Sequence, residues 1–254
     1  MALIEHHHHG MPSWVDAMVD SGEQLVQMRN LLSSLFHWSW DHGTDDTGHY
    51  SIARDRGRPV CGLGQSEGSD GRFVTYFATD SVVNSIARAT SLGGTLTVGP
   101  FEVMEQGSMA LVRDPVGVLH GLWQPNTFEG FGVVRELNTP GWFDHASGDP
   151  SWAAEYYAGL TGHSILEPEP GMLILMNGEE WFASFSEQQV APRAPRWNAL
   201  YVVDSLARIR ETIVDLGGHV LVEEMPVPGT TICIFTEPVC GNVMTVMAAG
   251  PAGG

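Results

Sequence analysis

The sequence predicts an α+β fold built from four βαβββ units that form two homologous halves. Three observations predict it: ordered motifs recur at nearly one offset, helical stretches are few and short, and alternating strand-like segments fill most of the rest. A chain of 254 residues suits two domains of roughly 125 residues each. The 43% hydrophobic content, with 30 Gly and 15 Pro, is typical of a packed protein that is rich in turns.

The repeat is visible in three pairs of motifs. PSWVD at 12–16 returns as PGWFD at 140–144, an offset of 128 residues. Asp80-Ser81 followed by Leu-Gly-Gly returns 124 residues later, and the turn Asp-Pro-Val-Gly at 114–117 returns as Glu-Pro-Val-Cys-Gly at 237–241. The order is the same in both halves, so we predict a first domain at 11–126, a linker at 127–138 and a second domain at 139–250.

Alternation and capping residues place the elements of the first half. Residues 13–20 alternate as a strand, and Ser21 can cap a helix that runs to about Leu35. Strands are expected at 50–55 and 58–64 around an Asp-Arg-Gly turn, and a second unit begins with a strand at 72–80. Ser81 then caps a helix that ends at Gly93-Gly94. Three further strands are expected at 95–100, 108–114 and 116–124.

The second half repeats this order. Its predicted helices run from Asp149 to Leu160 and from Ser205 to Leu216. Its predicted strands are 141–147, 171–177, 179–186, 196–204, 219–224, 231–236 and 242–248. Short helices beside many strands favour curved mixed sheets with the helices on their outer faces.

Composition excludes several classes of function. The 12 basic residues are all Arg, and the net charge is −18. Without Lys, the chain can form no Lys Schiff base and carries no Walker-type phosphate lysine. The acidic surplus argues against nucleic acid as a partner, because neutralising phosphates needs a basic face.

The ends and the cysteines indicate a protein of the cytoplasm. No apolar run reaches the roughly 18 residues of a membrane span, and no signal peptide is apparent. Three sparse cysteines, Cys61, Cys233 and Cys240, predict reduced thiols. The string EHHHHG at 5–10 is interpreted as part of a tag remnant covering residues 1–10, with a metal-binding tract as the alternative.

The ordered motifs resemble the vicinal oxygen chelate superfamily, which includes glyoxalase I, bleomycin-resistance proteins and extradiol dioxygenases. The resemblance rests on YFATDS (76–81), LGG (92–94), MALVRDPVG (109–117) and GLWQ (121–124), together with WVD (14–16) and LFHW (35–38). They are similar to two-domain glyoxalase-like proteins of actinobacterial type. The resemblance covers Met11 to Met247 and implies a U-shaped sheet around a cleft in each half.

The resemblance also implies where a metal would bind. Its metal-dependent members carry a His on the first strand, a His six residues before the next strand's closing Asp, and a Glu four residues after the Gly of the D-P-x-G turn. Those positions hold Trp14 (or Ala17 in a shifted register), Val74 and Gly121 in the first half, and Trp142, Asn198 and Thr245 in the second. None is His, Cys, Asp or Glu, so we expect no catalytic metal and no cofactor. His120 lies one residue off a ligand position, and strand alternation should turn it to the other face.

Residues with the strand parity of the missing ligands should face the clefts instead. The expected ligand-binding residues are Trp14, Met18, Val74, Tyr76, Trp123, Trp142, Asn198, Leu200 and Thr245. This set is mostly aromatic and apolar, as in pockets for organic ligands, and indoles offer flat faces for planar rings. The alternative is that these side chains only fill the interior.

Two carboxyl groups, Asp16 and Asp144, each follow a Trp by two residues at equivalent positions. In an apolar cleft their pKa can rise, so they are the candidate general acids or bases. The alternative is a structural Asp that accepts a backbone hydrogen bond.

Three hypotheses follow. The first is a metal-independent protein that holds a planar aromatic or hydrophobic small molecule, as monomer or homodimer, for sequestration, self-resistance or antibiotic biosynthesis. The second is a metal-independent cyclase, isomerase or lyase that uses Asp16 or Asp144. The third is a metalloenzyme of the glyoxalase or dioxygenase type.

Overall fold

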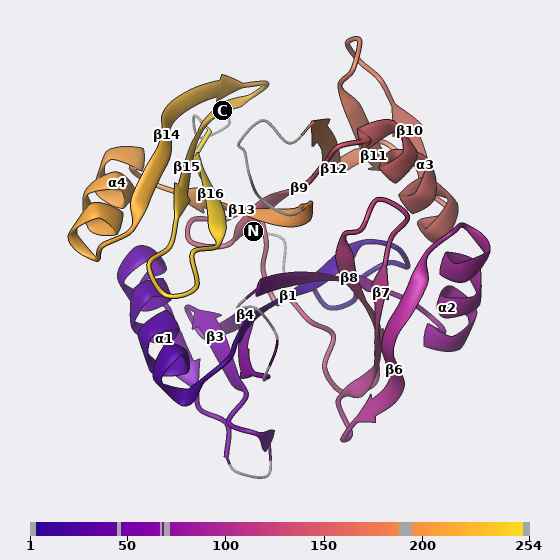
Figure 1. The fold of residues 1–254 in the computed structure, drawn as a ribbon, viewed down its shortest axis with the longest axis horizontal. Coiled ribbons are helices and arrows are strands. Elements are labelled where there is room, and N and C mark those ends of the chain that lie inside the picture. Colours follow the sequence, from indigo (N-terminus) through magenta and orange to yellow (C-terminus); the bar gives the residue numbers. More distant parts are fainter. Residues whose placement is uncertain (1–3, 45–46, 67, 69–71, 188–194, 251–254) are drawn as a thin grey trace.

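The computed structural model describes residues 4–44, 47–66, 68, 72–187 and 195–250. Each half folds into its own eight-stranded mixed sheet, and four helices occur among the described residues (Figure 1). The predicted α+β class with two glyoxalase-like halves is therefore confirmed. No helix of the described chain is long and apolar enough to cross a membrane.

The first sheet is centred on two neighbouring strands, β1 and β5. Its strands are β1 (Pro12–Val19), β2 (Ser39–Asp41), β3 (Ser51–Asp55), β4 (Arg58–Gln65), β5 (Arg72–Ala78), β6 (Thr95–Val103), β7 (Gly107–Arg113) and β8 (Leu119–Pro125). They lie in the order β2-β3-β4-β1-β5-β8-β7-β6. β1 runs antiparallel to β5 and parallel to β4, and β5 runs parallel to β8.

The second sheet repeats that order strand for strand. Its strands are β9 (Pro140–Ser147), β10 (Ser164–Leu166), β11 (Leu173–Asn177), β12 (Glu180–Glu187), β13 (Arg196–Val203), β14 (His219–Val227), β15 (Thr230–Thr236) and β16 (Val243–Ala248). They lie in the order β10-β11-β12-β9-β13-β16-β15-β14. The internal duplication read from the sequence thus extends to the topology.

Each helix begins one residue after the residue predicted to cap it (Ser21, Ser81) or to start it (Asp149, Ser205). α1 (Gly22–Phe36), α2 (Val82–Ser91), α3 (Pro150–Thr161) and α4 (Leu206–Asp215) follow the N-caps Ser21, Ser81, Asp149 and Ser205. In each case the cap side chain accepts a hydrogen bond from a backbone N–H of the first turn, which satisfies one otherwise unpaired donor. α1 lies beside α4 and α2 beside α3, at opposite sides of the molecule (Figure 1).

Two short strands were not predicted. β2 and β10 each have three residues and pair at a sheet edge with β3 and β11. Segments this short show too few alternations to stand out from a loop.

Aromatic side chains join the two halves into one core. Phe77 of the first half lies edge-on to Trp197 of the second at 5.3 Å, and Phe36 lies 4.8 Å from Tyr201. The Trp38 indole N–H donates to the Asn138 carbonyl at 2.7 Å. Burial of such rings removes apolar surface from water and stabilises the contact between the halves.

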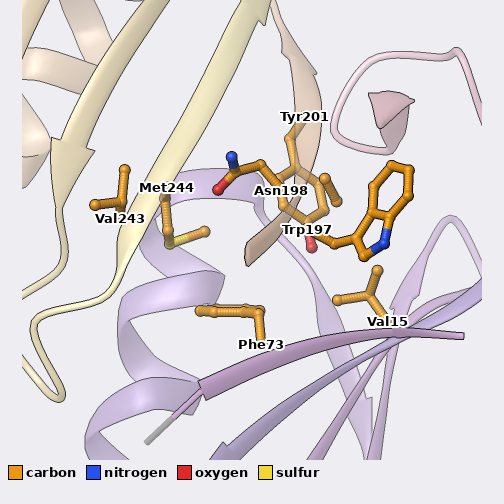
Figure 2. A pocket seen from close by; sticks show the side chains of 8 residues that line it. Val15, Phe73, Trp197, Asn198, Tyr201, Val243 and Met244 are labelled. Carbon is orange, nitrogen blue, oxygen red and sulfur yellow. The ribbon is translucent and has the colours of Figure 1, made fainter. Parts of the chain in front are cut away.

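A small cavity remains at this junction, where Val15 and Phe73 face Trp197, Tyr201 and Met244 (Figure 2). Its volume is about 20 Å³, which is room for about one water molecule. An organic ligand therefore does not fit into this cavity.

The start of the chain and the connection between the halves lie against each other. The His7 ring is buried, 3.1 Å from the Phe131 carbonyl oxygen, and the Gly10 N–H donates to the Ala78 carbonyl. The predicted domain boundaries and the tag interpretation of residues 1–10 stay predictions. All three cysteines are unpaired thiols.

Candidate functional site

One face of each sheet is turned away from the helices, although several of its side chains are buried in the common core. In the first half Val15, Ala17 and Val19 belong to the buried core with the side chains of α1. The alternate residues therefore point to the opposite face. We call this the helix-free face; in the first half it carries Trp14, Asp16, Met18, Gly62, Gly64, Val74, Tyr76, Gly121 and Trp123.

A buried carboxyl group lies at the centre of this face. Oδ1 of Asp16 accepts hydrogen bonds from the Tyr50 hydroxyl at 2.5 Å and from the Trp14 indole N–H at 2.9 Å. The same indole N–H lies 2.8 Å from the Tyr50 oxygen. The Tyr76 hydroxyl also favours the charged form of this carboxyl group. The two donors on Oδ1 keep the carboxylate hydrogen-bonded although it is buried.

The surroundings set the protonation of these groups. Burial raises the pKa of Asp16, and the hydrogen bonds from Tyr50, Tyr76 and Trp14 oppose that rise. Burial and the negative charge of Asp16 raise the pKa of Tyr50 and of Tyr76 well above the ordinary value, so both hydroxyls stay protonated donors.

Glycines provide the space that the network occupies. Gly62 pairs with Asp16, and a Cβ on Gly62 would lie 1.9 Å from the Tyr50 hydroxyl oxygen and 2.2 Å from Oδ1 of Asp16. A Cβ on Gly121 would lie 2.0 Å from the Tyr76 ring. The tyrosines thus reach the carboxyl group because these two positions carry no side chain.

An apolar wall adjoins the network. In β6, β7 and β8 the register aligns Phe101 with Met109 and Trp123, and Val98 with Leu111 and Gly121. Phe101 and Val98 are 45% and 40% exposed, whereas Trp123 is 7% exposed. Accessible apolar surface therefore leads from the sheet edge toward the carboxyl group.

The linker residue Phe128 covers one end of this face. Its ring stands edge-on to Trp14 at 4.9 Å, and its carbonyl accepts a hydrogen bond from the Trp123 indole N–H at 2.8 Å. Trp14, Val74 and Tyr76 are nearly fully buried, while Met18 is half-buried. Part of the predicted ligand surface is thus filled by the protein's own side chains.

The second half has a different set of groups around its equivalent carboxyl. Asp144 accepts from the Ser184 hydroxyl at 2.7 Å on Oδ1 and from the Ser186 hydroxyl at 2.8 Å on Oδ2. The Trp142 indole N–H donates to the Ser184 hydroxyl at 2.9 Å. Burial raises the pKa of Asp144, and the two serine hydrogen bonds lower it in part.

The remaining predicted residues of the second half lie beside Asp144. Asn198 pairs with Asp144 across β13 and β9, and its Oδ1 accepts from Nε of Arg196 at 2.8 Å. Leu200 pairs with Trp142 on one side and Thr245 on the other. The structure thus groups all eleven predicted residues into two clusters of equivalent position, one on each sheet.

Sequence reasoning missed Tyr50, Ser184, Ser186 and Arg196. Ser184 and Ser186 alternate in a predicted strand, so their shared face was readable. Tyr50 was hidden, because its contact depends on the parallel register of β1 and β4, which local sequence does not specify. Trp181, of undetermined parity in the sequence, lies beside a register shift and is 42% exposed.

The six positions at which the resemblance implies metal ligands carry no His, Cys, Asp or Glu side chain. Indole, alkyl and hydrogen occupy the three positions of the first half, and the Tyr76 ring occupies the space above Gly121. In the second half the Asn198 oxygen is engaged by Arg196. Among the described residues no three His, Cys, Asp or Glu side chains are grouped to hold a metal. His120 is buried on the helix-covered face, with its Nδ1 3.2 Å from the Val112 carbonyl.

Comparisons with known proteins identify relatives of similar sequence and solved structures of similar fold. The protein named "Putative glyoxylase CFP32" in Mycobacterium tuberculosis is 26% identical over 95% of this chain and 96% of its own length. The anthracycline biosynthesis protein DnrV of Streptomyces peucetius is 23% identical over 86% of each chain. The Mn(II)-bound glyoxalase of Novosphingobium aromaticivorans superposes with a TM-score of 0.66 at 16% identity, covering 96% of this chain and 83% of that chain.

In sequence motifs and fold the chain resembles the two-domain glyoxalase-like proteins of the vicinal oxygen chelate superfamily. The 2,3-dioxygenase LapB of Pseudomonas sp. KL28 has a similar fold, with a TM-score of 0.64 at 12% identity over 96% of this chain and 94% of LapB. No family model matches the chain. The chain differs at all six ligand positions named above from the metal-dependent pattern that the resemblance implies.

Proposed function

We propose that the protein binds a planar aromatic or hydrophobic small molecule on the helix-free face without a metal ion. The observation that carries this proposal is the substitution of every expected metal ligand by indole, apolar or weakly ligating side chains beside an accessible apolar wall. Apolar pockets with a few polar groups are the usual form of organic ligand sites.

A role in secondary metabolism is part of the proposal. DnrV and DauV, relatives at 23% and 22% identity, are named as anthracycline biosynthesis proteins. Sequestration, self-resistance and assistance to a biosynthetic enzyme each need such a binder.

Tryptophan fluorescence tests the binding. Anthraquinone should quench the chelator-treated protein with a saturable curve, because Trp14 and Trp123 border the apolar wall. Phe101→Ala should weaken binding about tenfold, since it removes a ring from that wall. Leu96→Ala is the matched control: Leu96 lies on the same strand, is 39% exposed, and pairs with the buried Val112. Equal loss in both variants, or no quenching at all, would reject the proposal.

A metal-independent enzyme is the second candidate, favoured by the two buried carboxyl groups with raised pKa. Asp16 or Asp144 would exchange a proton with the substrate. The double variant Asp16→Asn/Asp144→Asn should then lose turnover of a substrate while it still binds that substrate. Unchanged turnover in the double variant would reject the enzymatic role.

A further inference from the structure

We propose that the ligand of the first half is a phenol, a hydroxylated aromatic ring that takes the place of the Tyr50 side chain on Asp16. This inference rests on the proposed function and specifies the chemistry of its ligand. Tyr50 is itself a phenol, and it occupies the polar centre of the helix-free face as an internal substitute.

The first argument is the hydrogen bonding of the Tyr50 hydroxyl. It donates to Oδ1 of Asp16 at 2.5 Å and accepts from the Trp14 indole N–H at 2.8 Å. An incoming phenol provides the same donor and the same acceptor. The exchange therefore replaces each hydrogen bond that is lost, whereas a ring without a hydroxyl would leave the buried Asp16 with one donor fewer, the Trp14 indole N–H.

The second argument is the hollow in which Tyr50 lies. Gly62 and Gly64 pair with Asp16 and Met18 on β1, and Tyr50 covers both glycines. A Cβ on Gly64 would lie 3.1 Å from the Tyr50 ring and 3.1 Å from the Met18 sulfur. Removing the Tyr50 side chain from this place opens a ring-sized space between two glycines and a flexible Met, which adapts its shape readily.

The second half shows the same positions without the hollow. Ser184 stands opposite Asp144 as Gly62 stands opposite Asp16, and Ser186 is the equivalent of Gly64. Both serines donate to Asp144. Asp144 is thus hydrogen-bonded by the short serine side chains of the neighbouring strand β12. The ring-sized hollow therefore lies in the first half.

The third argument is how the two tyrosines are held. Tyr76 projects from the central strand β5, is 4% exposed and rests on Gly121. Tyr50 immediately precedes β3, outside the central strands, and is half-buried. Displacing Tyr50 disturbs no central strand, and the adjoining apolar wall can cover the rest of a larger ring system.

Calorimetric titration with two matched probes tests the proposal: 2-naphthol, and 2-methoxynaphthalene, which has the ring but no hydroxyl donor. Wild type should prefer 2-naphthol. Tyr50→Ala should bind 2-naphthol about tenfold more tightly than wild type, because the competing internal phenol is gone. Tyr50→Phe keeps the ring in place and removes only its hydrogen bonds, so it should show a smaller gain in affinity and guards against misfolding of the Ala variant.

Two further variants locate the effect. Asp16→Asn combined with Tyr50→Ala should abolish the preference for 2-naphthol over its methyl ether. Met172→Ala alters the position of the second half that corresponds to Tyr50, two residues before the Ile that pairs with Ser184, and should leave the affinity for 2-naphthol unchanged.

The outcomes separate the two proposals. If both probes bind equally in wild type and in Tyr50→Ala, the phenol inference is wrong and the hydrophobic binding site stands. If neither probe nor anthraquinone binds any folded variant, the proposed function itself is wrong. A gain in Met172→Ala as large as in Tyr50→Ala would also overturn the phenol inference, because the site would then lie elsewhere.

Discussion

Nε2 of His145 lies 2.9 Å from Oδ2 of Asp114, and both side chains are fully buried where the two halves meet. Asp114 belongs to the turn after β7, and His145 to β9 of the other half. The Tyr157 hydroxyl donates to the same oxygen at 3.2 Å, while Oδ1 accepts the backbone N–H groups of Val116 and Val118. One carboxyl group thus orders a turn in the first half and joins it to the second.

Asp114→Ala should lower the free energy of unfolding by about 3 kcal/mol, because it leaves buried donors of both halves without an acceptor. Urea denaturation measures this loss. Asp41→Asn is the control, since Asp41 pairs with Arg54 at the surface, is 59% exposed, and should change stability by less than about 1 kcal/mol. Equal losses of unfolding free energy in the two variants would show that the buried Asp114 contacts do not stabilise the protein more than a surface ion pair does.

The buried His120 should make stability depend on pH. Burial lowers the pKa of His120 from 6.5 to about 4; the neighbouring Asp114 opposes this shift and His145 adds to it. The unfolded chain therefore takes up a proton on this side chain at a higher pH than the folded chain does. Stability is lost as the pH falls from about 6.5 toward 4, by about 3 kcal/mol from this group alone.

His120→Gln tests that contribution by urea denaturation at pH 7 and pH 4. The variant should lose less free energy of unfolding between the two pH values than wild type, because it carries no titrating ring at that position. The exposed His42→Gln is the control and should behave as wild type does. Identical pH dependence in His120→Gln and wild type would contradict the assignment.

Gly121→Ala should destabilise the protein by about 1–3 kcal/mol, because the added methyl group would meet the Tyr76 ring at 2.0 Å and force a buried side chain to move. Thermal unfolding measures the change. Gly148→Ala is a matched substitution at a glycine with no atom within 4 Å and no positive φ, and it should be nearly neutral. A stable Gly121→Ala variant would mean that Tyr76 is not fixed against this position.

Removing the Ser184 or Ser186 hydroxyl should raise the pKa of Asp144 further, because each donates a hydrogen bond that favours the charged carboxylate. NMR titration of the side-chain carboxyl carbon in Ser184→Ala and Ser186→Ala measures the direction. Ser164→Ala, at the sheet edge on β10, is the control and should leave the pKa of Asp144 unchanged. A lower pKa in either variant would show that the hydroxyl does not act as the donor.

The sequence predicted the fold because each signal is local and occurs twice. Ser21, Ser81, Asp149 and Ser205 mark the helix starts, and the repeated Trp-x-Asp marks the central strands. The repeated motif also predicted that Asp16 and Asp144 occupy equivalent positions. It did not reveal that Tyr50 reaches Asp16, since that contact needs the register of a parallel pair and two empty glycine positions. Long-range register is a property of the packed sheet, not of the local pattern.

Titration of anthraquinone into protein freed of metal by a chelator, followed by tryptophan fluorescence and repeated with added Mn²⁺, tests the central claim most directly. The account predicts saturable quenching in the metal-free protein and the same curve after Mn²⁺ is added. Quenching that occurs only with Mn²⁺ would show that ligand binding depends on a cation held by the chain, and would contradict the account.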